Sequence, residues 1–254
     1  MQAGSLIRVL VIAGWAWGAF VCAVFPAQAQ RESVTARIDV TRRSAAKQES
    51  AAGASKNLSE VVLWLEPLDH ASALAASGDT GRKKPQMMQR NKTFEPHLLV
   101  VRTGTVIEFP NRDPFFHNVF SLFDGKRFDL GLYEAGSTNS VRFDRTGVSF
   151  LFCNIHPEMS AVVVAVDTPY YGVSDSSGNV TISDVPDGRY ELHAWYERSL
   201  PDDLKSATRT VSISSRSREL GVVPITENPA FSSAHKNKYG QDYVPPPDTG
   251  YSHP

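Results

Sequence analysis

Four residues with metal-binding side chains stand at two places in the chain. Cys153, His156 and Met159 lie within seven consecutive residues, and His117 lies upstream in the apolar run Phe115–Ser121. One thiolate, two imidazoles and a weakly bound thioether are the donors of a mononuclear copper site that transfers electrons. Such a mixture of soft and harder donors suits both Cu(I) and Cu(II), so the ligand geometry need not change much when an electron passes. We therefore take these four residues as candidate ligands and copper as the candidate metal.

Three of the candidate ligands are predicted to share one loop. The run Phe150–Phe152 is apolar and aromatic, as strands often are, and Ala161–Val166 is a second such run. Cys153 follows the first run directly, and Pro157 restricts the backbone between the last two ligands. A strand, a tight loop and a returning strand would present the three residues together. The fourth ligand must be brought to them by another part of the fold.

The first 29 residues are typical of a secretory signal peptide. Arg8 is followed by an apolar stretch from Val9 to Phe25, and Ala27–Ala29 matches the A-x-A motif of a signal-peptide cleavage site. We expect cleavage before Gln30 and a periplasmic protein. The alternative is an uncleaved anchor, but the apolar stretch is short for a spanning helix. No later segment is long and apolar enough to span a bilayer, so we expect the exported protein not to be embedded in the membrane.

Charge and cysteine content narrow the function further. Lys and Arg number 26 against 27 Asp and Glu, which is a formal net charge of −1. A nucleic-acid-binding protein would need a strongly basic face, so we expect no nucleic-acid partner.

Cleavage removes Cys22 and leaves Cys153 unpaired in an oxidising compartment. It could be an inert core thiol, half of an intermolecular disulfide or a metal-bound thiolate, and the neighbours at 156 and 159 favour the metal.

Strand signals recur at short intervals, and no long stretch has helical periodicity. Turns that contain Gly, Pro or Asn separate the strands, as in a sandwich or a barrel. The predicted fold class is therefore all-β. The predicted strands cover residues 34–40, 61–65, 97–101, 106–109, 141–143, 148–152, 161–166, 180–182, 190–196, 208–213 and 220–225.

We divide the chain into four parts. After the signal peptide at 1–29, residues 30–167 are expected to form a copper-binding domain with two long polar loops. Residues 168–225 are expected to form a small β module, which is marginal alone and should pack on its neighbour. Residues 226–254 carry several Pro, Gly and Ser and few aliphatic side chains, so a disordered tail is expected.

The ligand motifs resemble those of the cupredoxins. C-x-x-H-x-x-M at Cys153–Met159 resembles the short ligand loop of amicyanin-like members, and Phe116–Val119 resembles the first-histidine segment of plastocyanin-like members. Gly104–Asn111 resembles the strand ahead of that histidine, so the likeness covers roughly residues 87–167. It implies a Greek-key β-sandwich in which the four candidate residues bind copper. It also implies that Asn118 helps to tether the ligand loop.

The second unit resembles a different family. Val185–Tyr190, within residues 172–195, is similar to part of a carboxypeptidase-regulatory-like β module, which implies a small β-sandwich. Together the two units resemble bacterial exported proteins of the methylamine-utilisation or plastocyanin-like type. That likeness does not by itself imply a role in amine metabolism.

Some residues depart from a simple cupredoxin pattern. Glu158 lies beside Met159, and a carboxylate near copper would favour Cu(II) and lower the reduction potential. His97 is an additional imidazole, which we interpret as an ordinary histidine at the start of a strand. The remaining histidines have no ligand partners in the sequence and are taken as non-ligands; they are His70, His193, His235 and His253.

The leading hypothesis is one-electron transfer between a donor and an acceptor redox protein in the periplasm, with no enzymatic activity. His156 would be the exposed port for electrons, and apolar residues near it would form a small docking surface. Three alternatives stay open: a copper-delivery protein with the same ligands, an enzyme with Cys153 as nucleophile and His156 as base, and a zinc site. A strand-turn-strand position gives no helix N-terminus to lower the pKa of the thiol, and Met159 favours copper over zinc.

Overall fold

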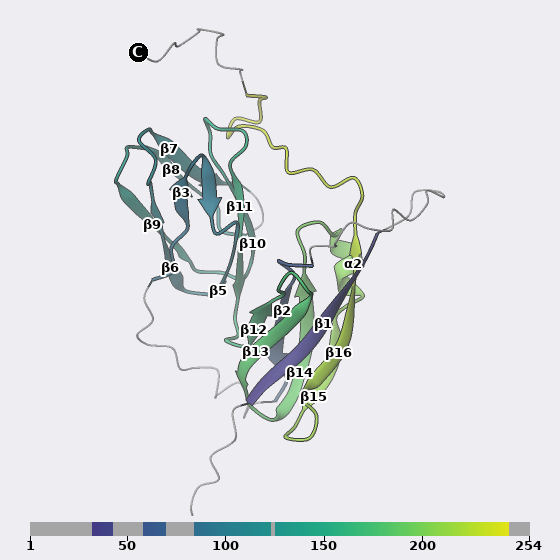
Figure 1. Ribbon diagram of the computed structural model, residues 1–254. Helices are drawn as coiled ribbons and strands as arrows, with labels where there is room; N and C mark the ends of the chain where they lie inside the picture. The colour runs from purple at the N-terminus through teal and green to yellow at the C-terminus, as the bar shows by residue number, and fades with distance from the viewer. Residues whose placement is uncertain (1–31, 43–57, 70–83, 123–124, 244–254) are drawn as a thin grey trace, which may run out of the picture.

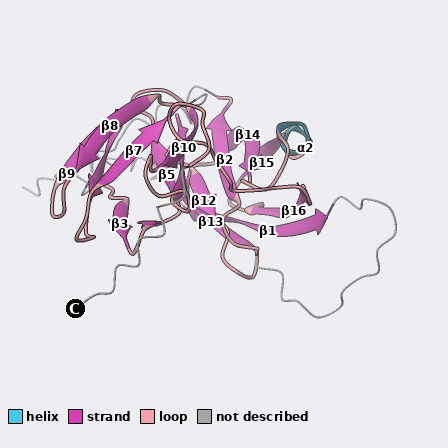
Figure 2. Ribbon diagram, turned by 90° about the horizontal axis from the view of Figure 1, so that it is seen from above, coloured by secondary structure: helices cyan, strands magenta, loops and turns pink. Residues whose placement is uncertain are grey.

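The computed structural model describes residues 32–42, 58–69, 84–122 and 125–243. Within these ranges the chain forms sixteen strands and one short helix, α2 (Pro201–Lys205). Figure 2 shows the strands in magenta throughout both halves of the molecule and the helix in cyan at one side. The predicted all-β class is confirmed.

Strands β3 to β11 build the unit that contains the candidate ligands (Figure 1). Five of them form a sheet in the order β5-β11-β10-β7-β8, while β6 pairs with β9 and β3 pairs with β4. The bounds are β3 (Met88–Arg90), β4 (Thr93–Glu95), β5 (Leu98–Arg102), β6 (Thr105–Pro110), β7 (His117–Ser121), β8 (Phe128–Tyr133), β9 (Thr138–Phe143), β10 (Gly147–Phe152) and β11 (Ser160–Val166).

The core of this first unit lies between its layers. Phe109 of β6 packs in one cluster with Leu151 of β10 and Val163 of β11, and all three are fully buried. Cys153 and Met159 belong to the same cluster. The loop that carries candidate ligands is therefore anchored at one end of the hydrophobic core.

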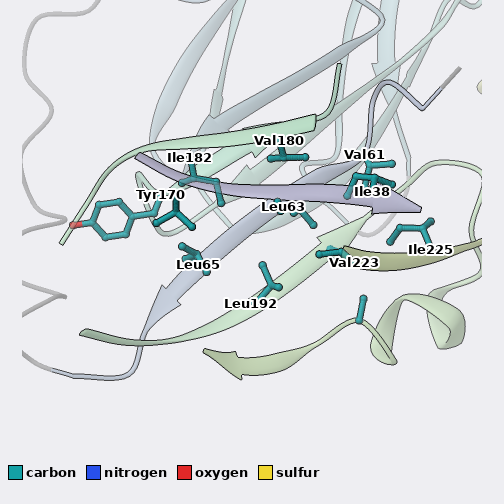
Figure 3. Packing of buried hydrophobic residues seen from close by; sticks show 14 of the residues in the cluster. Ile38, Val61, Leu63, Leu65, Tyr170, Val180, Ile182, Leu192, Val223 and Ile225 are labelled. Carbon is teal, nitrogen blue, oxygen red and sulfur yellow. The ribbon is translucent and has the colours of Figure 1, made fainter. Parts of the chain in front are cut away.

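The remaining strands form a second unit of two sheets. Their orders are β13-β1-β16 and β12-β2-β14-β15. The bounds are β1 (Glu32–Arg42), β2 (Val62–Pro67), β12 (Tyr171–Val173), β13 (Asn179–Val185), β14 (Gly188–Trp195), β15 (Arg209–Ile213) and β16 (Glu219–Glu227). Figure 3 shows the core of this unit, where Ile38 and Val223 from one sheet approach Leu63 and Leu192 from the other.

The make-up of the second unit corrects the predicted division of the chain. We placed the strands at 34–40 and 61–65 in the domain 30–167, but β1 lies between β13 and β16, and β2 lies between β12 and β14. β1 alternates between buried and exposed residues, so the sequence reveals a strand with one buried face. That pattern does not reveal the partner, which here is parallel β16 at the far end of the chain.

The two units pack face to face. Val162 and Val164 of β11, on the outer face of the first unit, share a cluster with Trp64 of β2 and Trp195 of β14. β11 is consequently buried on both faces, which explains its unbroken apolar run. The expectation that the small module packs on its neighbour is confirmed.

The predicted disordered tail is wrong for the part of it that the structure describes. β16 continues to Glu227, and residues 228–243 follow a defined course from the second unit to the first, visible as the yellow-green segment in Figure 1. The ring of His235 stacks on Phe152 with centroids 4.1 Å apart, and the backbone N–H of Lys238 donates to Oδ1 of Asn154 at 3.0 Å. Aromatic and polar contacts hold the segment, although its sequence has few aliphatic residues.

Several predictions fall outside the described residues. These are the signal peptide at 1–29, most of the polar loops at 41–59 and 70–86, and the last residues of the tail. Among the described residues, no helix is long and apolar enough to cross a membrane.

Candidate metal centre

The loop between β10 and β11 has the form predicted from the sequence. β10 ends at Phe152 and β11 begins at Ser160, so the loop spans Cys153–Met159. The backbone N–H of Met159 donates to the carbonyl of His156 at 3.1 Å, and the N–H of Cys153 donates to the carbonyl of Met159 at 3.3 Å. These bonds close a compact turn that returns the chain to the neighbouring strand.

His117 reaches this loop because it begins β7, the strand beside β10. The two strands pair at Phe120 and Phe152. Three side chains that the sequence separates thereby come together: His117, Cys153 and His156 form a group whose ligand atoms all lie within 4.8 Å of one another. His117 and Cys153 are fully buried, and His156 is partly exposed.

The three ligand atoms form a small triangle. Sγ of Cys153 lies 3.8 Å from Nδ1 of His117 and 3.6 Å from Nδ1 of His156, and the two nitrogens are 3.1 Å apart. The circle through these three atoms has a radius of about 2.0 Å. Nitrogen and sulfur ligands stand about 2.0 to 2.3 Å from a first-row metal such as zinc. The arrangement therefore fits three donors to one metal ion.

Met159 is fully buried in the same hydrophobic cluster as Cys153. It ends the turn that carries Cys153 and His156, through the two backbone hydrogen bonds that close the loop. The fold thus brings all four sequence-predicted residues to one region of the first unit.

Asp113 orients His117, and the sequence analysis missed this residue. Its Oδ2 lies 2.8 Å from Nε2 of His117 in a buried contact. A carboxylate at Nε2 holds the proton there and leaves the lone pair of Nδ1 free for a metal. The only signal in the sequence is an acidic residue four positions before a candidate ligand.

Asp113 is itself held in place by backbone groups. The N–H groups of Asn91 and Lys92 donate to its two carboxylate oxygens at 2.6 and 2.9 Å. Both donors have positive φ angles, 53° and 54°, in the tight turn between β3 and β4. Burial acts to raise the pKa of Asp113, but these bonds and the one from His117 outweigh it and hold the pKa below its usual value. Asp113 is therefore a carboxylate at neutral pH.

Burial shifts the pKa values of Cys153 and His156 in opposite directions. Burial raises the pKa of the Cys153 thiol, opposed by backbone N–H groups of Ile155, Asn118 and His156. Burial also lowers the pKa of His156. The imidazole of His156 is therefore neutral at neutral pH, and metal binding would release the thiol proton.

Asn118 contacts the ligand loop through its backbone, as the family resemblance implied, while its side chain bonds to β8. Its side-chain N–H groups donate to Oδ1 of Asp129 at 2.7 Å and to the carbonyl of Gly131 at 2.9 Å, both on β8. The side chain of Asn118 therefore bonds to β8, while its backbone N–H donates to the Cys153 sulfur. Glu158 is exposed on the loop, and its charge acts to raise the pKa of both Cys153 and His156.

His97 and His193 have partners of their own among the described residues. Nδ1 of His97 is 3.1 Å from the carbonyl of Ser160, and its Nε2 is 2.8 Å from Oε2 of Glu197 in the second unit. His193 belongs to a separate group with Glu66 and Glu191. His70 and His253 lie outside the described residues.

A tyrosine from the C-terminal segment also contacts the site region. The hydroxyl of Tyr243 donates to the carbonyl of Cys153 at 2.5 Å and lies 3.2 Å from Nδ1 of His235. No pattern in the sequence connects this residue to the ligand loop.

No protein-family model matches the chain, and no curated protein matches it. Among solved structures, it is similar to a purple cupredoxin from Nitrosopumilus maritimus, with 22% identity, a TM-score of 0.30, and coverage of 32% of this chain and 99% of that chain. A Cu(I) amicyanin variant is 18% identical, with a TM-score of 0.32 and coverage of 41% of this chain and 98% of that chain. A copper-containing nitrite reductase from Thermus scotoductus SA-01 is 24% identical, with a TM-score of 0.32 and coverage of 39% of this chain and 27% of that chain. At these values the likenesses assign no function, and the chemistry rests on the geometry of the site itself.

Proposed function

We propose that this protein is a cupredoxin: an exported carrier that holds one copper ion and passes single electrons between two redox proteins in the periplasm. The observation that carries the proposal is the buried triangle of two Nδ1 atoms and one Sγ, with the far nitrogen of His117 fixed by Asp113. His117, Cys153 and His156 would hold the metal, and Met159 would add a weak thioether. When bound, copper would supply the exchange between Cu(I) and Cu(II).

The surroundings of the triangle support a carrier with a rigid, largely dry site. His117, Cys153 and Met159 have no exposed surface, so bulk water is kept from most of the donor set. His156 is partly exposed and would be the point at which electrons enter or leave. Phe115, with 36% of its surface exposed, contacts the rings of His117 and His156, and Ile155 and Phe116 are also exposed nearby. These residues suit a small, weak docking surface for a redox partner.

The burial of Cys153 argues against an enzyme that uses this thiol as a nucleophile. Cys153 is fully buried, and burial raises the pKa of its thiol. A thiol nucleophile needs the thiolate and access to a substrate, and neither condition fits this residue. Zinc would be held by the same imidazoles and thiolate, but it would give Met159 no role.

Copper delivery is the second candidate, because partial exposure of His156 also gives a route for the ion itself. A stoichiometric redox titration of the copper-loaded protein distinguishes an electron carrier from a copper-delivery protein. A carrier takes up and releases one electron per chain, and it keeps its copper in both states when a Cu(I) chelator is present. Quantitative loss of copper to the chelator on reduction would contradict electron transfer and support delivery.

Export can be tested separately from the metal. We expect the protein in a periplasmic extract to begin at Gln30, which the intact mass would reveal. A full-length chain in the membrane fraction would contradict cleavage of the signal peptide.

A further inference from the structure

A second group of metal-binding side chains lies on the second unit. Glu66 on β2, and Glu191 and His193 on β14, offer ligand atoms that all lie within 4.8 Å of one another. The antiparallel register of β2 and β14 sets Glu191 opposite Glu66 and His193 opposite Trp64. Because side chains alternate along a strand, all of them project from the face that packs on the first unit.

Two carboxylates stand directly across from each other in this group. Like charges at opposed positions of neighbouring strands destabilise a sheet. The side chains of Glu66 and Glu191 are 46% and 42% exposed, so each is partly removed from the water that would screen its charge. A cation between the two carboxylates would remove the repulsion.

Trp64 holds two of the three side chains in place. Its ring stacks on that of His193, with centroids 5.1 Å apart and planes 13° apart. Its indole N–H donates to Oε1 of Glu66 at 3.1 Å, which leaves Oε2 of the same carboxylate on the side of His193. One rigid residue thus restricts both an imidazole and a carboxylate, as the outer contacts of metal sites do.

The Nε2 nitrogen of His193 is aimed into the group. Nε2 lies 3.1 Å from Oε2 of Glu191 and 3.6 Å from Oε2 of Glu66. It is buried and has no hydrogen-bond partner of good geometry among the residues that the structure describes. The lone pair of a neutral imidazole at this position would point toward both carboxylate oxygens.

We propose that Glu66, Glu191 and His193 form a second metal site, which takes a divalent first-row cation of the Zn²⁺ type. One imidazole and two carboxylates are zinc ligands, and the tetrahedral bond lengths of zinc place neighbouring N and O ligands about 3.3 to 3.5 Å apart. The distances of 3.1 and 3.6 Å in this group bracket that range. Three protein ligands on a partly exposed face leave the fourth position to water. This site shares no ligand with the copper centre and does not depend on its proposed function.

Zinc titration of the full chain tests the site. A background variant, H117A with C153S, removes the first site, and we expect it to bind one Zn²⁺ per chain by calorimetry. In that background, His193→Ala should weaken binding by at least tenfold, and the isosteric changes Glu66→Gln and Glu191→Gln should act in the same direction. The matched control Glu219→Gln, at an exposed position on β16, should leave binding unchanged.

A spectroscopic measurement keeps the test independent of calorimetry. Co²⁺ bound beside Trp64 should quench part of the tryptophan fluorescence of a Trp195→Phe protein, and His193→Ala should abolish the quenching. Far-ultraviolet circular dichroism of each variant checks that it is folded. If the background variant binds no zinc, His193 only contacts the two carboxylates and the proposal is overturned. Binding that is unaffected by His193→Ala would overturn it as well.

Discussion

The two ring nitrogens of His117 have separate contacts. Nε2 faces Asp113, and Nδ1 faces Cys153 and His156. The sequence was enough to select His117, Cys153 and His156, which the fold brings together, because their residue types and the spacing of the last two in one short loop are informative. It could not predict Asp113 as the orienting residue, because the turn that aims its carboxylate comes from β3 and β4. Nor could it place the side chain of Asn118, which turns to β8.

Asp113→Asn should weaken metal binding. The amide cannot accept two backbone N–H bonds and hold the proton of His117 as a carboxylate does, so His117 loses its fixed orientation. Loss of such a contact costs roughly 10- to 100-fold in metal affinity. Competition titration with a chelator measures the change. Asp144→Asn, which removes an exposed ion pair with Lys126, is the control, and equal affinity for both variants would contradict the role of Asp113.

Elements with one buried face were the easiest to predict. β1 and β9 alternate, and the predicted strands overlap them. β7 was missed as a strand because His117, Asn118 and Ser121 interrupt its apolar residues, so the sequence shows neither an apolar run nor an alternation, although all five residues are buried. The course of residues 228–243 was missed for another reason. Its contacts with the ligand loop come from a few polar and aromatic groups, which composition alone does not reveal.

Tyr243→Phe should destabilise the ligand loop. The substitution removes the hydroxyl that donates to the carbonyl of Cys153, and a hydrogen bond of this kind contributes about 1 kcal/mol. Hydrogen exchange of the loop amides should become faster, and the free energy of unfolding should fall by about that amount. Tyr239→Phe, at a ring that is 71% exposed, should change neither quantity. Equal protection of the loop in the two variants would argue against the contact.

At the scale of the whole molecule, the chain crosses between the units more than once. β1 and β2 precede the first unit in sequence and lie in the second, where β1 separates β13 from β16. Sequence patterns predicted two packed β units, but they could not predict such distant pairings, because a strand pattern carries no information about its partner. The outer face of β11 joins the units, with His97 and Glu197 at its edge.

A fragment limited to residues 168–227 should not fold. The fragment lacks β1, the middle strand of one sheet, and β2, an inner strand of the other. Ile182 and Leu192 would therefore lose much of their packing. We expect poor dispersion in its proton NMR spectrum and no cooperative thermal transition. A fragment that joins residues 32–69 to 168–227 is the matched comparison. A cooperative transition in the shorter fragment would contradict the observed pairing.

The contact between His97 and Glu197 should make stability depend on pH. Both ring nitrogens of His97 face acceptors, so the contact is complete when the ring is protonated. The hydrogen bond to Glu197 raises the pKa of His97 above its ordinary value of 6.5, despite burial. The stabilisation is therefore full below pH 6.5 and is lost as the pH rises through the higher pKa of the folded state.

Thermal unfolding across this pH range measures the effect. The wild type should lose more stability than Glu197→Gln as the pH rises, because the variant has no carboxylate to favour the imidazolium. Parallel curves for the two proteins would rule out a contribution from this pair.

The central claim is that Cys153, His117 and His156 hold copper through the thiolate and two imidazoles, and the absorption spectrum of the Cu(II)-loaded protein tests it most directly. We expect an intense visible band from charge transfer between the thiolate and Cu(II). The band should disappear in Cys153→Ser, while circular dichroism shows that the variant remains folded. A wild-type protein that binds Cu(II) without this band, or a band that survives in Cys153→Ser, would contradict the account.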